Sequence, residues 1–273
     1  MRTFHLRVRS RNKSCAPLRD LEFSKRAILR LGSTTKTSQI TKRKDYIEIN
    51  SAEACRISGN KTLMKQRFTH AKIRTAPWFK ISEGDIHITK ENKIFSNRIW
   101  RKLDKWKKII AKYNYSSGGK GIFLIESMDD FDRFYREQVA NQYRLISDFI
   151  FERYYTYSRE YRIHVTEDGC FLADRKMLKE DAVDRWHRHG SNCVWISEDN
   201  PLFDKPVNWF SICESCIKAM KSIGLDICCF DVKVQNNKHE FPEWIILESN
   251  SAPALGDVSI EKYKEQITKI ING

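Results

Sequence analysis

Two apolar segments near the C-terminus each carry a carboxylate, and this feature constrains the fold of the chain more than any other. Residues 227–234 read ICCFDVKV and residues 244–248 read WIILE. Apolar runs of this length are typical of buried β-strands. Asp231 and Glu248 lie within these runs, where a carboxylate is costly to bury unless a cation compensates it. The segments therefore predict two strands that hold acidic side chains beside positive charge.

The alternation of side chains along a strand predicts which groups meet. The side chains expected on the acidic faces are Cys229, Asp231 and Lys233 in the first strand and Ile246, Glu248 and Asn250 in the second. If the strands are neighbours, Asp231, Glu248 and Asn250 converge and offer the hard oxygen ligands that Mg²⁺ prefers. The alternative is that each carboxylate pairs with Lys233 or with an arginine.

Positive charge is concentrated in the first part of the chain. The formal net charge is +14, from 49 Lys and Arg and 35 Asp and Glu. Residues 1–120 have a net charge of +21, whereas residues 121–273 have a net charge of −7. This asymmetry indicates attraction of an anion by the first part and a separate role for the carboxylates of the second. Ordinary solvated surface is the alternative for both.

The composition excludes whole-chain disorder and a membrane-spanning protein. Hydrophobic residues make up 41% and aromatic residues 12% of the 273 residues, which is enough to build a core. No stretch approaches the roughly 20 apolar residues that span a bilayer, and the first residues lack the apolar block of a secretory signal. We therefore expect a cytoplasmic protein with no membrane partner.

The remaining pattern mixes strands with helices. The expected strands are residues 4–8, 45–50, 109–112, 121–125, 145–151, 161–165 and 171–173. The expected helices are residues 18–31, 51–70, a helix capped by Ser127, a helix around Cys213, and residues 259–271. Lys61 lies inside the second of these helices. Because the strands at 109–112 and 121–125 are close in sequence, we expect them to form a hairpin.

The tip of that hairpin is rich in glycine. Three of the 11 glycines of the chain fall in the run Gly118-Gly119-Lys120-Gly121. Glycines let backbone N–H groups approach an anion, and Lys112 and Lys120 add positive charge. The spacing is not that of a Walker loop, and a simple turn is the alternative.

Residues 98–108, RIWRKLDKWKK, form a basic run with two tryptophans. Such a run can contact phosphates or stack on bases, so nucleic acid is a possible partner of the basic first part. The alternative is an amphipathic helix in which Lys and Arg stems pack over the Trp rings.

The eight cysteines are expected to be reduced thiols. Cys213 and Cys216 have the spacing of a zinc knuckle, but no second pair follows and their helical pattern favours burial. In the segment 159–164, the side chains of Glu160, Arg162 and His164 alternate along one strand face. There a carboxylate can bind ribose and an arginine can bind phosphate, or the two can form cross-strand ion pairs.

The order of these features resembles the ATP-grasp superfamily over residues 50–256. The segment ILESNSAPAL at 246–255 is similar to the family's metal-binding E-x-N-x-x-P segment, and ICCFDV at 227–232 is similar to its preceding acidic strand. The resemblance implies an α+β fold in which two α+β lobes clasp a nucleotide. About 50 residues precede the core, so the N-terminal α/β lobe is expected to be reduced, as in the compact ATP-grasp proteins encoded by some phages.

The resemblance also implies a division of the chain and a set of site residues. The expected parts are a short N-terminal lobe (1–50), the first part of the core (51–97), a lid with the Gly-rich flap (98–151) and a C-terminal subdomain with the metal site (152–273). The residues implied to bind ATP are Lys61, Lys112, Ser116, Ser117, Gly118, Gly119, Lys120, Gly121, Glu152, Arg153, Tyr154, Tyr155 and Glu160. Arg162 and either Arg175 or Lys176 are implied to face the triphosphate or the acyl phosphate. Asp231, Glu248 and Asn250 are implied to hold two Mg²⁺ ions, or Mn²⁺ in their place. The family's hinge usually begins with glutamine where Glu152 stands.

The activity that the resemblance implies is an ATP-dependent ligase that joins a carboxylate to an amine or a thiol through an acyl phosphate. Its partners would be ATP and an anionic or carboxylate-bearing substrate. A small-molecule phosphotransferase with the same fold and a nucleic-acid-binding protein without ATP turnover are the alternatives. A lysine-adduct polynucleotide ligase is disfavoured because no KxDG motif is present.

Overall fold

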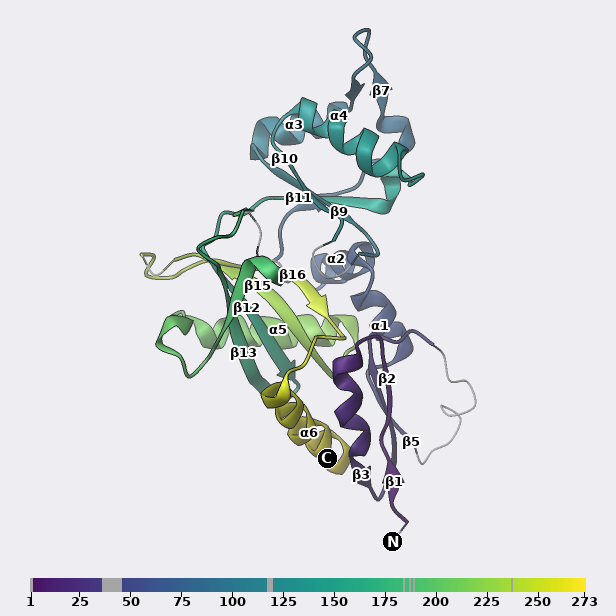
Figure 1. Ribbon diagram of the computed structural model, residues 1–273, viewed down its shortest axis with the longest axis vertical. Helices are drawn as coiled ribbons and strands as arrows, with labels where there is room; N and C mark the ends of the chain where they lie inside the picture. Colours follow the sequence, from purple (N-terminus) through teal and green to yellow (C-terminus); the bar gives the residue numbers. More distant parts are fainter. Residues whose placement is uncertain are drawn as a thin grey trace. The chain divides into compact units, whose positions relative to one another are not determined.

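The chain folds into two compact units, each with its own hydrophobic core. The computed structural model describes residues 2–35, 46–116, 120–183, 185, 186, 188, 190–236 and 238–273. The first unit comprises Met1–Thr75, Tyr157–Ala182 and Cys193–Gly273, and the second comprises Ala76–Thr156 and Val183–Asn192. Figure 1 labels the helices and strands of both units.

The first unit begins with a small parallel sheet. Its elements are β1 (Phe4–His5), β2 (Arg7–Ser10), the 3₁₀ helix η1 (Lys13–Asp20), β3 (Glu22–Phe23), β4 (Arg26–Leu31) and β5 (Tyr46–Ile49). Strands β2, β4 and β5 pair in parallel in that order, and β1 pairs with β3. One face of this sheet shares a core with η1 and with α6 (Asp257–Asn272).

The expectation of a helix over residues 18–31 is wrong. The chain forms the end of η1, then β3 and β4 over these residues. Residues 27–31 of β4 are all buried, as is typical of a central strand covered on both faces, and Ala27, Leu29 and Leu31 lie in the core shared with α6. Pairing with two parallel neighbours therefore outweighs the helix propensity of the Leu, Arg and Lys residues in this segment.

The expected helix over residues 51–70 is two helices, α1 (Ala52–Ser58) and α2 (Lys61–His70). Ser51 caps α1 by accepting a hydrogen bond from the backbone N–H of Ala54. Asn60 caps α2 in the same way through the N–H of Leu63. A cap in the middle of the pattern restarts the helix, so Lys61 is the first residue of α2 and does not lie in a helix interior.

A five-stranded antiparallel sheet forms the rest of the first unit. Its strands are β12 (Arg159–Thr166), β13 (Gly169–Leu178), β14 (Cys193–Ser197), β15 (Ile227–Val234) and β16 (Trp244–Asn250), in the order β14-β13-β12-β15-β16. The 3₁₀ helix η6 (Pro201–Phe203) and α5 (Trp209–Ile223) follow β14. Every neighbouring pair of these strands is antiparallel, and the predicted pairing of residues 227–234 with residues 244–248 is confirmed.

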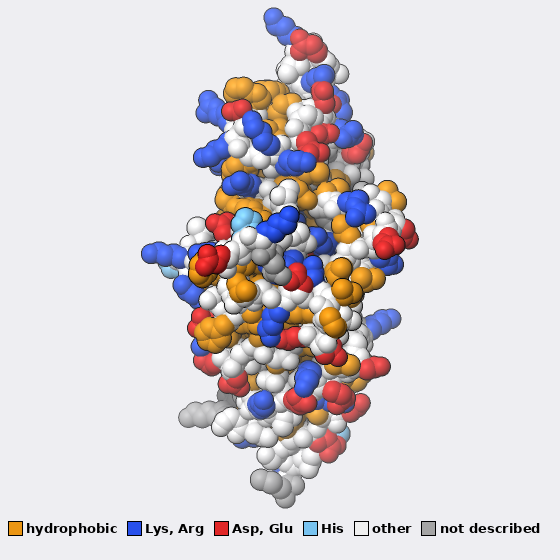
Figure 2. Space-filling model, turned by 90° about the vertical axis from the view of Figure 1, so that its left-hand side faces the viewer, with side chains coloured by type: hydrophobic (Ala, Val, Ile, Leu, Met, Phe, Trp, Pro, Cys, Tyr) orange, Lys and Arg blue, Asp and Glu red, His pale blue; other side chains and the backbone are white. Residues whose placement is uncertain are grey.

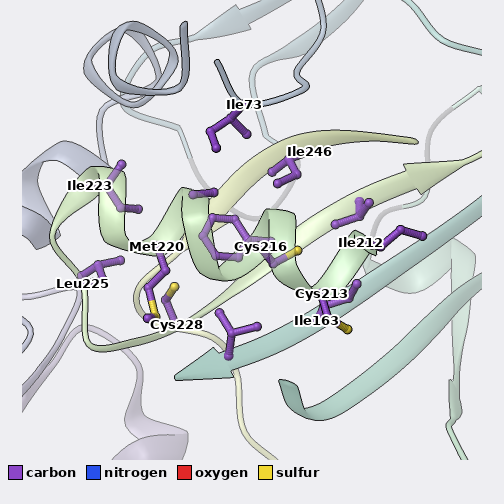
Figure 3. Close-up of a cluster of buried hydrophobic side chains, with 14 of the residues drawn as sticks. Ile73, Ile163, Ile212, Cys213, Cys216, Met220, Ile223, Leu225, Cys228 and Ile246 are labelled. Atoms are coloured by element: carbon purple, nitrogen blue, oxygen red, sulfur yellow. The ribbon is translucent and has the colours of Figure 1, made fainter. Parts of the chain in front are cut away.

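Helix α5 covers one face of this sheet (Figure 1). Figure 3 shows Cys213, Cys216 and Met220 of α5 among side chains of the strands, including Ile163 and Ile246. The cluster is almost wholly shielded from solvent. All eight cysteines are free thiols, and both members of the Cys213–Cys216 pair are buried in this core. Because this face is apolar, the polar side chains of the same strands gather on the opposite face.

The second unit is built on a four-stranded sheet with the order β10-β9-β11-β6. Its elements are β6 (Trp78–Phe79), η2 (Glu83–Asp85), β7 (His87–Ile88), β8 (Ile94–Phe95), α3 (Asn97–Trp106), β9 (Ile109–Tyr113), β10 (Ile122–Ile125), α4 (Met128–Phe134), the π-helical turn η3 (Tyr135–Ala140), η4 (Ile146–Asp148), β11 (Phe149–Arg153) and η5 (Gly190–Asn192). The predicted hairpin is present as β9 and β10, and Ser127 caps α4 as expected. The predicted strand over residues 145–151 begins only at Phe149, after η4.

A bilayer-spanning segment was not expected from the composition. Among the helices formed by the described residues, none has both the length and the apolar character that a membrane crossing needs.

Candidate functional site

The polar face of the five-stranded sheet gathers most of the acidic and basic residues that the sequence singles out in the first unit. Antiparallel register places Arg162 of β12 opposite Asp231 of β15, and Glu160 of β12 opposite Lys176 of β13. Asp231 in turn lies opposite Glu248 of β16. Lys233 of β15 lies opposite Glu160, and Asp174 of β13 lies opposite Arg162, so four strands bring three cations and four carboxylates onto one surface.

Asp231 is held by two of the cations of this surface. Arg162 donates to both carboxylate oxygens, from Nε to Oδ1 at 2.9 Å and from an Nη to Oδ2 at 3.1 Å. Lys176 donates from Nζ to Oδ2 of Asp231 at 2.6 Å and to Oε1 of Glu160 at 3.1 Å. These contacts are the cross-strand ion pairs that were the alternative expectation for Asp231 and for the segment 159–164. A bidentate arginine and an ammonium fix the orientation of this carboxylate.

The electrostatics of this network favour its charged form. Burial would raise the pKa of Asp231, but the charges of Arg162 and Lys176 outweigh it and lower that pKa. For Lys176, burial lowers the pKa and the carboxylates of Asp231 and Glu160 raise it, with a net upward shift. Burial also lowers the pKa of Arg162, but the charge of Asp231 raises it, and the net shift is upward. All three side chains are therefore ionised in the folded chain near neutral pH.

Glu248 differs from Asp231, although the two are paired across the strands. It is half-buried, and it makes no hydrogen bond or ion pair with the described residues. Asn250, which lies opposite Cys229, accepts a hydrogen bond at Oδ1 from the backbone N–H of Ala252 at 3.0 Å. That bond holds the amide oxygen in place and uses one of its two acceptor positions.

The expectation that Ile246 shares a face with Glu248 is wrong because β16 contains a β-bulge. Val232 pairs with Ile246 and Asp231 pairs with Glu248, so Leu247 has no partner on β15. The extra residue shifts the alternation by one position. Ile246 therefore packs in the core with Val232, whereas Glu248 lies on the face of Asp231.

The donor set of Asp231, Glu248 and Asn250 fits a hard divalent cation in its chemistry, because two carboxylates and an amide oxygen are ligands that Mg²⁺ takes. Among the described residues there is no group of three or more His, Cys, Asp or Glu side chains arranged to hold a metal ion. The third protein ligand would therefore have to be the amide oxygen of Asn250.

The sequence left open whether Arg175 or Lys176 faces the phosphates, and the two lie on opposite faces of β13. Lys176 joins the network of Asp231. Arg175 donates to the backbone oxygen of Leu202 at 2.7 Å and forms an ion pair with Asp204 at 3.3 Å, on the side of α5 and η6. Of the two residues, the structure brings only Lys176 to the candidate site.

Trp195 of β14 belongs to this surface and was not singled out from the sequence. The guanidinium of Arg162 lies 4.8 Å from its ring centroid, and Nζ of Lys176 lies 5.3 Å from it. Trp195 pairs with Lys176 across the strands and is 45% exposed. The one signal in the sequence was its alternating position in an apolar segment, which gives no hint of the non-local contact.

His164 lies on the same face of β12 but at its buried end. Its Nδ1 is 3.0 Å from the hydroxyl oxygen of Tyr263 on α6. Burial, assisted by the charge of Arg162 and opposed by that of Asp231, lowers the pKa of His164 to about 3. The imidazole is therefore neutral in the folded chain, and it links the sheet to α6.

Lys61 is also buried in the first unit, at the start of α2, with 8% of its surface exposed. The expectation that it enters a nucleotide site from this helix stays a prediction.

The second unit has its own buried ion pair. Lys112 of β9 donates from Nζ to Oε2 of Glu152 on β11 at 2.8 Å. Both side chains are almost fully buried. Strands β9 and β11 are antiparallel neighbours, and Lys112 pairs with Ile150, two residues before Glu152. The strand lysine and the first residue of the expected hinge thus contact each other directly.

The Gly-rich tip of the hairpin lies only partly within the described residues. Ser117, Gly118 and Gly119 fall outside them. Ser116 donates from Oγ to the backbone oxygen of Tyr113 at 2.8 Å, and Lys120 is exposed. Gly121 has a φ of +68°, and a Cβ there would lie 3.0 Å from Cβ of Tyr113, so this end of the turn requires glycine.

The segment expected to form the hinge leaves β11 in an ordered path. Arg153 donates its N–H to the oxygen of Pro77 at 2.9 Å, and its guanidinium lies 5.1 Å from the ring centroid of Tyr155. The Tyr154 hydroxyl donates to the backbone oxygen of Trp186 at 2.6 Å.

The basic run forms α3, and its packing supports the amphipathic alternative in part. Nζ of Lys102 lies 4.7 Å from the Trp106 ring centroid, so a lysine stem does cover one of the tryptophans. Trp100 is 52% exposed. On the face shown in Figure 2, Lys and Arg side chains are interspersed with acidic and hydrophobic ones. The described residues on that face form no continuous basic surface, and they give no support for nucleic acid as a partner.

The chain is similar to several solved structures. It matches D-alanine–D-alanine ligase from Bacillus anthracis with a TM-score of 0.61 and 13% identity, covering 89% of this chain and 75% of that one. It matches a β,γ-ATP complex of biotin carboxylase from Campylobacter jejuni with a TM-score of 0.60 and 17% identity, covering 89% and 53%. It matches the ATP-grasp ligase PsnB, complexed with a minimal precursor, Mg and ADP, with a TM-score of 0.53 and 15% identity, covering 82% and 62%.

No family model matches the sequence, and no curated protein matches it. At these identities the structural matches establish the fold alone. The mixed helices and strands, the order of the elements and these neighbours agree with the architecture expected from the sequence. The chain has the α+β fold of the ATP-grasp superfamily.

Proposed function

We propose that the chain is an ATP-dependent ligase that joins a carboxylate to an amine or a thiol through an acyl phosphate. The observation that carries the proposal is the pairing of Asp231 with Glu248 beside Arg162 and Lys176, on one face of a sheet in an ATP-grasp fold. The structural neighbours support it, because they include ligases and a complex of PsnB with Mg and ADP.

Asp231, Glu248 and Asn250 would hold Mg²⁺. The ion would neutralise charge on the phosphates of ATP. Glu248 is the residue best prepared to take it up, because none of the described residues forms a hydrogen bond or an ion pair with its carboxylate. Asp231 is already oriented by Arg162, so its position would change little when a ligand binds.

Arg162 and Lys176 would contact the transferring phosphoryl group and stabilise the charge that develops on it. The expectation that Lys112 contacts phosphates of the nucleotide stays a prediction. A substrate carboxylate oxygen attacks the γ-phosphorus, and the bond to the β-phosphate oxygen breaks and releases ADP. The amine or thiol then attacks the acyl carbon, phosphate leaves, and the nucleophile loses a proton.

The substrate would carry a carboxylate, and a peptide is one class to test because PsnB is described with a precursor peptide. The test is an ADP-release assay with Mg-ATP and pooled amino acids, peptides and thiols, followed by mass spectrometry. Formation of phosphate together with an amide or thioester supports the ligase. A phosphorylated product would instead identify a phosphotransferase.

The assay is made specific by a pair of variants. Glu248→Gln should abolish ATP turnover and leave thermal unfolding within a few degrees of the parent, because this side chain makes no hydrogen bond or ion pair with the described residues. Glu214→Gln, at an exposed position on α5, is the matched control and should keep full turnover. Normal Mg²⁺-dependent ADP release by Glu248→Gln would contradict the assignment.

A further inference from the structure

The N-terminal part of the first unit contains a hollow lined almost entirely by basic and hydroxyl side chains. It has a volume of about 470 Å³ and is lined by Arg7, Val8, Arg9, Ser10, Arg19 and Ser33. None of these residues belongs to the proposed nucleotide or metal site. A volume of a few hundred Å³ is that of a small-molecule site.

Two separate elements, β2 and η1, carry the arginines that line this hollow. Arg7 and Arg9 are two residues apart on β2, so their side chains lie on the same face, about 7 Å apart along the strand. Strand β2 is at the edge of its sheet, with β4 as its one neighbour in the sheet. Arg19 comes from the last turn of η1, which packs against β2. The arrangement is therefore anchored by the fold and not by a single loop.

The charge of the hollow is uncompensated. No acidic residue lines it. Arg7, Arg9 and Arg19 make no hydrogen bond or ion pair with any of the described residues. Arg30 of the neighbouring strand β4 shows the contrast, because its guanidinium contacts Glu48. Three arginines that line one hollow with no acidic residue in its lining make the hollow attractive to anions.

Of the two hydroxyls of the hollow, that of Ser33 can donate to an anionic ligand, whereas that of Ser10 already donates its proton to Asn12. Oγ of Ser10 donates to the backbone oxygen of Asn12 at 3.0 Å and accepts from the backbone N–H of Asn12 at 2.9 Å. These two hydrogen bonds fix the Ser10 side chain. Oγ of Ser33 accepts a hydrogen bond from the N–H of Thr35 at 3.5 Å, so its own proton is available to a ligand. Guanidinium and hydroxyl donors together recognise carboxylate and phosphate oxygens.

We propose that this hollow is a binding site for a small polyanion, a molecule with two or more carboxylate or phosphate groups. A ligand with two or more anionic groups is expected because three arginines line one hollow and a single anionic group would neutralise only part of their charge. Binding to this hollow does not depend on ATP turnover, so this proposal is tested independently of the ligase proposal.

The test is calorimetric titration of the full chain with pyrophosphate and, separately, with citrate, without Mg²⁺ or ATP and at constant ionic strength. Arg7→Gln/Arg9→Gln/Arg19→Gln should weaken binding at least tenfold. The control Lys105→Gln/Lys218→Gln/Lys238→Gln removes the same charge at exposed positions outside β2 and η1 and should leave the affinity within twofold. Binding of pyrophosphate alone identifies phosphate as the ligand chemistry, and binding of citrate alone identifies carboxylate.

Pyrophosphate could also bind the proposed nucleotide site, so the titration is repeated with Lys112→Ala/Lys176→Gln, which should leave the affinity of the hollow unchanged. Circular dichroism checks the fold of each variant. If the triple arginine variant fails to fold, Arg19→Gln, at an exposed position, replaces it with an expected loss of threefold or more. Equal loss in the arginine and control variants, or no binding of either probe at millimolar concentration, would overturn the proposal.

Discussion

The two units of the chain each pair cations with carboxylates inside a sheet, but they do so in different ways. In the second unit Lys112 contacts Glu152, and both are almost fully buried. In the first unit Asp231 receives hydrogen bonds from both Arg162 and Lys176, and Glu248 lies opposite it with no such bond among the described residues. The first unit therefore keeps one carboxylate, that of Glu248, available to a ligand, whereas the second unit keeps the carboxylate of Glu152 in a buried ion pair.

This difference indicates where binding and where stability are concentrated. A buried carboxylate that loses its cations, or a buried cation that loses its carboxylate, costs several kcal/mol because the remaining charge is desolvated. A half-buried carboxylate without ion pairs can be neutralised at little cost to the fold. Variants that remove one member of each arrangement can test this comparison directly.

The largest effect is expected for Asp231→Asn. Arg162 and Lys176 would remain buried with their main counter-charge removed, and the free energy of unfolding should fall by about 3–5 kcal/mol. Urea denaturation measures this change. Asp168→Asn, at an exposed turn between β12 and β13, is the control and should change it by less than about 0.5 kcal/mol. Similar values for the two variants would show that Asp231 does not hold the network together.

A smaller loss is expected for Lys112→Met in the second unit. The substitution keeps an apolar stem of similar length but removes the ammonium that contacts Glu152, at a cost of about 2–3 kcal/mol. ATP affinity, measured by calorimetry, should also fall if Lys112 contacts the phosphates. Lys105→Met, at an exposed position on α3, should change neither quantity. Unchanged ATP affinity in Lys112→Met would remove this lysine from the proposed site.

The acid sensitivity of the first unit should depend on His164. The pKa of His164 is lowered in the folded chain to about 3, so as pH falls from about 6.5 towards 3 the unfolded chain binds a proton that the folded chain does not. Stability is thus lost as pH falls through this window, with a slope of up to about 1.4 kcal/mol per pH unit. Of the neighbouring charges, Arg162 favours the neutral ring and Asp231 opposes it.

Unfolding curves of the parent and of His164→Gln, taken at half-unit steps from pH 7 to pH 4, measure this contribution. The variant should show the shallower slope, because the difference in bound protons is gone. The lowered pKa of Asp231 makes a separate contribution with its own window, since its stabilisation is present above about pH 3.9 and is lost below it. Parallel curves between pH 6.5 and 4 would show that His164 is not buried as a neutral group.

The smallest effect is expected for Trp195→Ala. Its ring covers Arg162 and Lys176 but is nearly half exposed, so the loss of the cation–π contacts should cost about 0.5–1 kcal/mol. Val194→Ala, on the same strand at 40% exposure, provides a matched control for the loss of apolar surface. If both variants lose the same amount, the contacts with the cations contribute nothing beyond burial.

The sequence predicted those parts of the fold that depend on local pattern. The hairpin of β9 and β10, the cap at Ser127, the two acidic strands and the ATP-grasp architecture agree with the structure. Strand β4 was mistaken for a helix because its parallel pairing with β2 and β5 comes from residues distant in sequence. The roles of the site residues in binding ATP and metal stay predictions.

Other features of the candidate site depend on contacts that no local pattern encodes. Trp195 reaches Arg162 from two strands away. Lys176 and not Arg175 lies beside Asp231 because of the face of β13 that each residue occupies, which depends on the register with β12. Which of the two contacts phosphates stays a prediction. The ion pairs around Asp231 were one of two alternatives, and they depend on contacts between strands that form only in the folded chain.

The unpaired Leu247 in β16 has a consequence for the two faces of this strand. In a regular strand, side chains alternate strictly between the two faces of the sheet, so residues two positions apart lie on the same face. The additional residue Leu247 interrupts this alternation, so Ile246 and Glu248 lie on opposite faces. If the strand paired with β15 without this bulge, Ile246 and Glu248 would lie on the same face, so the bulge is what allows a core side chain and a carboxylate of the candidate site to stand two positions apart in the sequence.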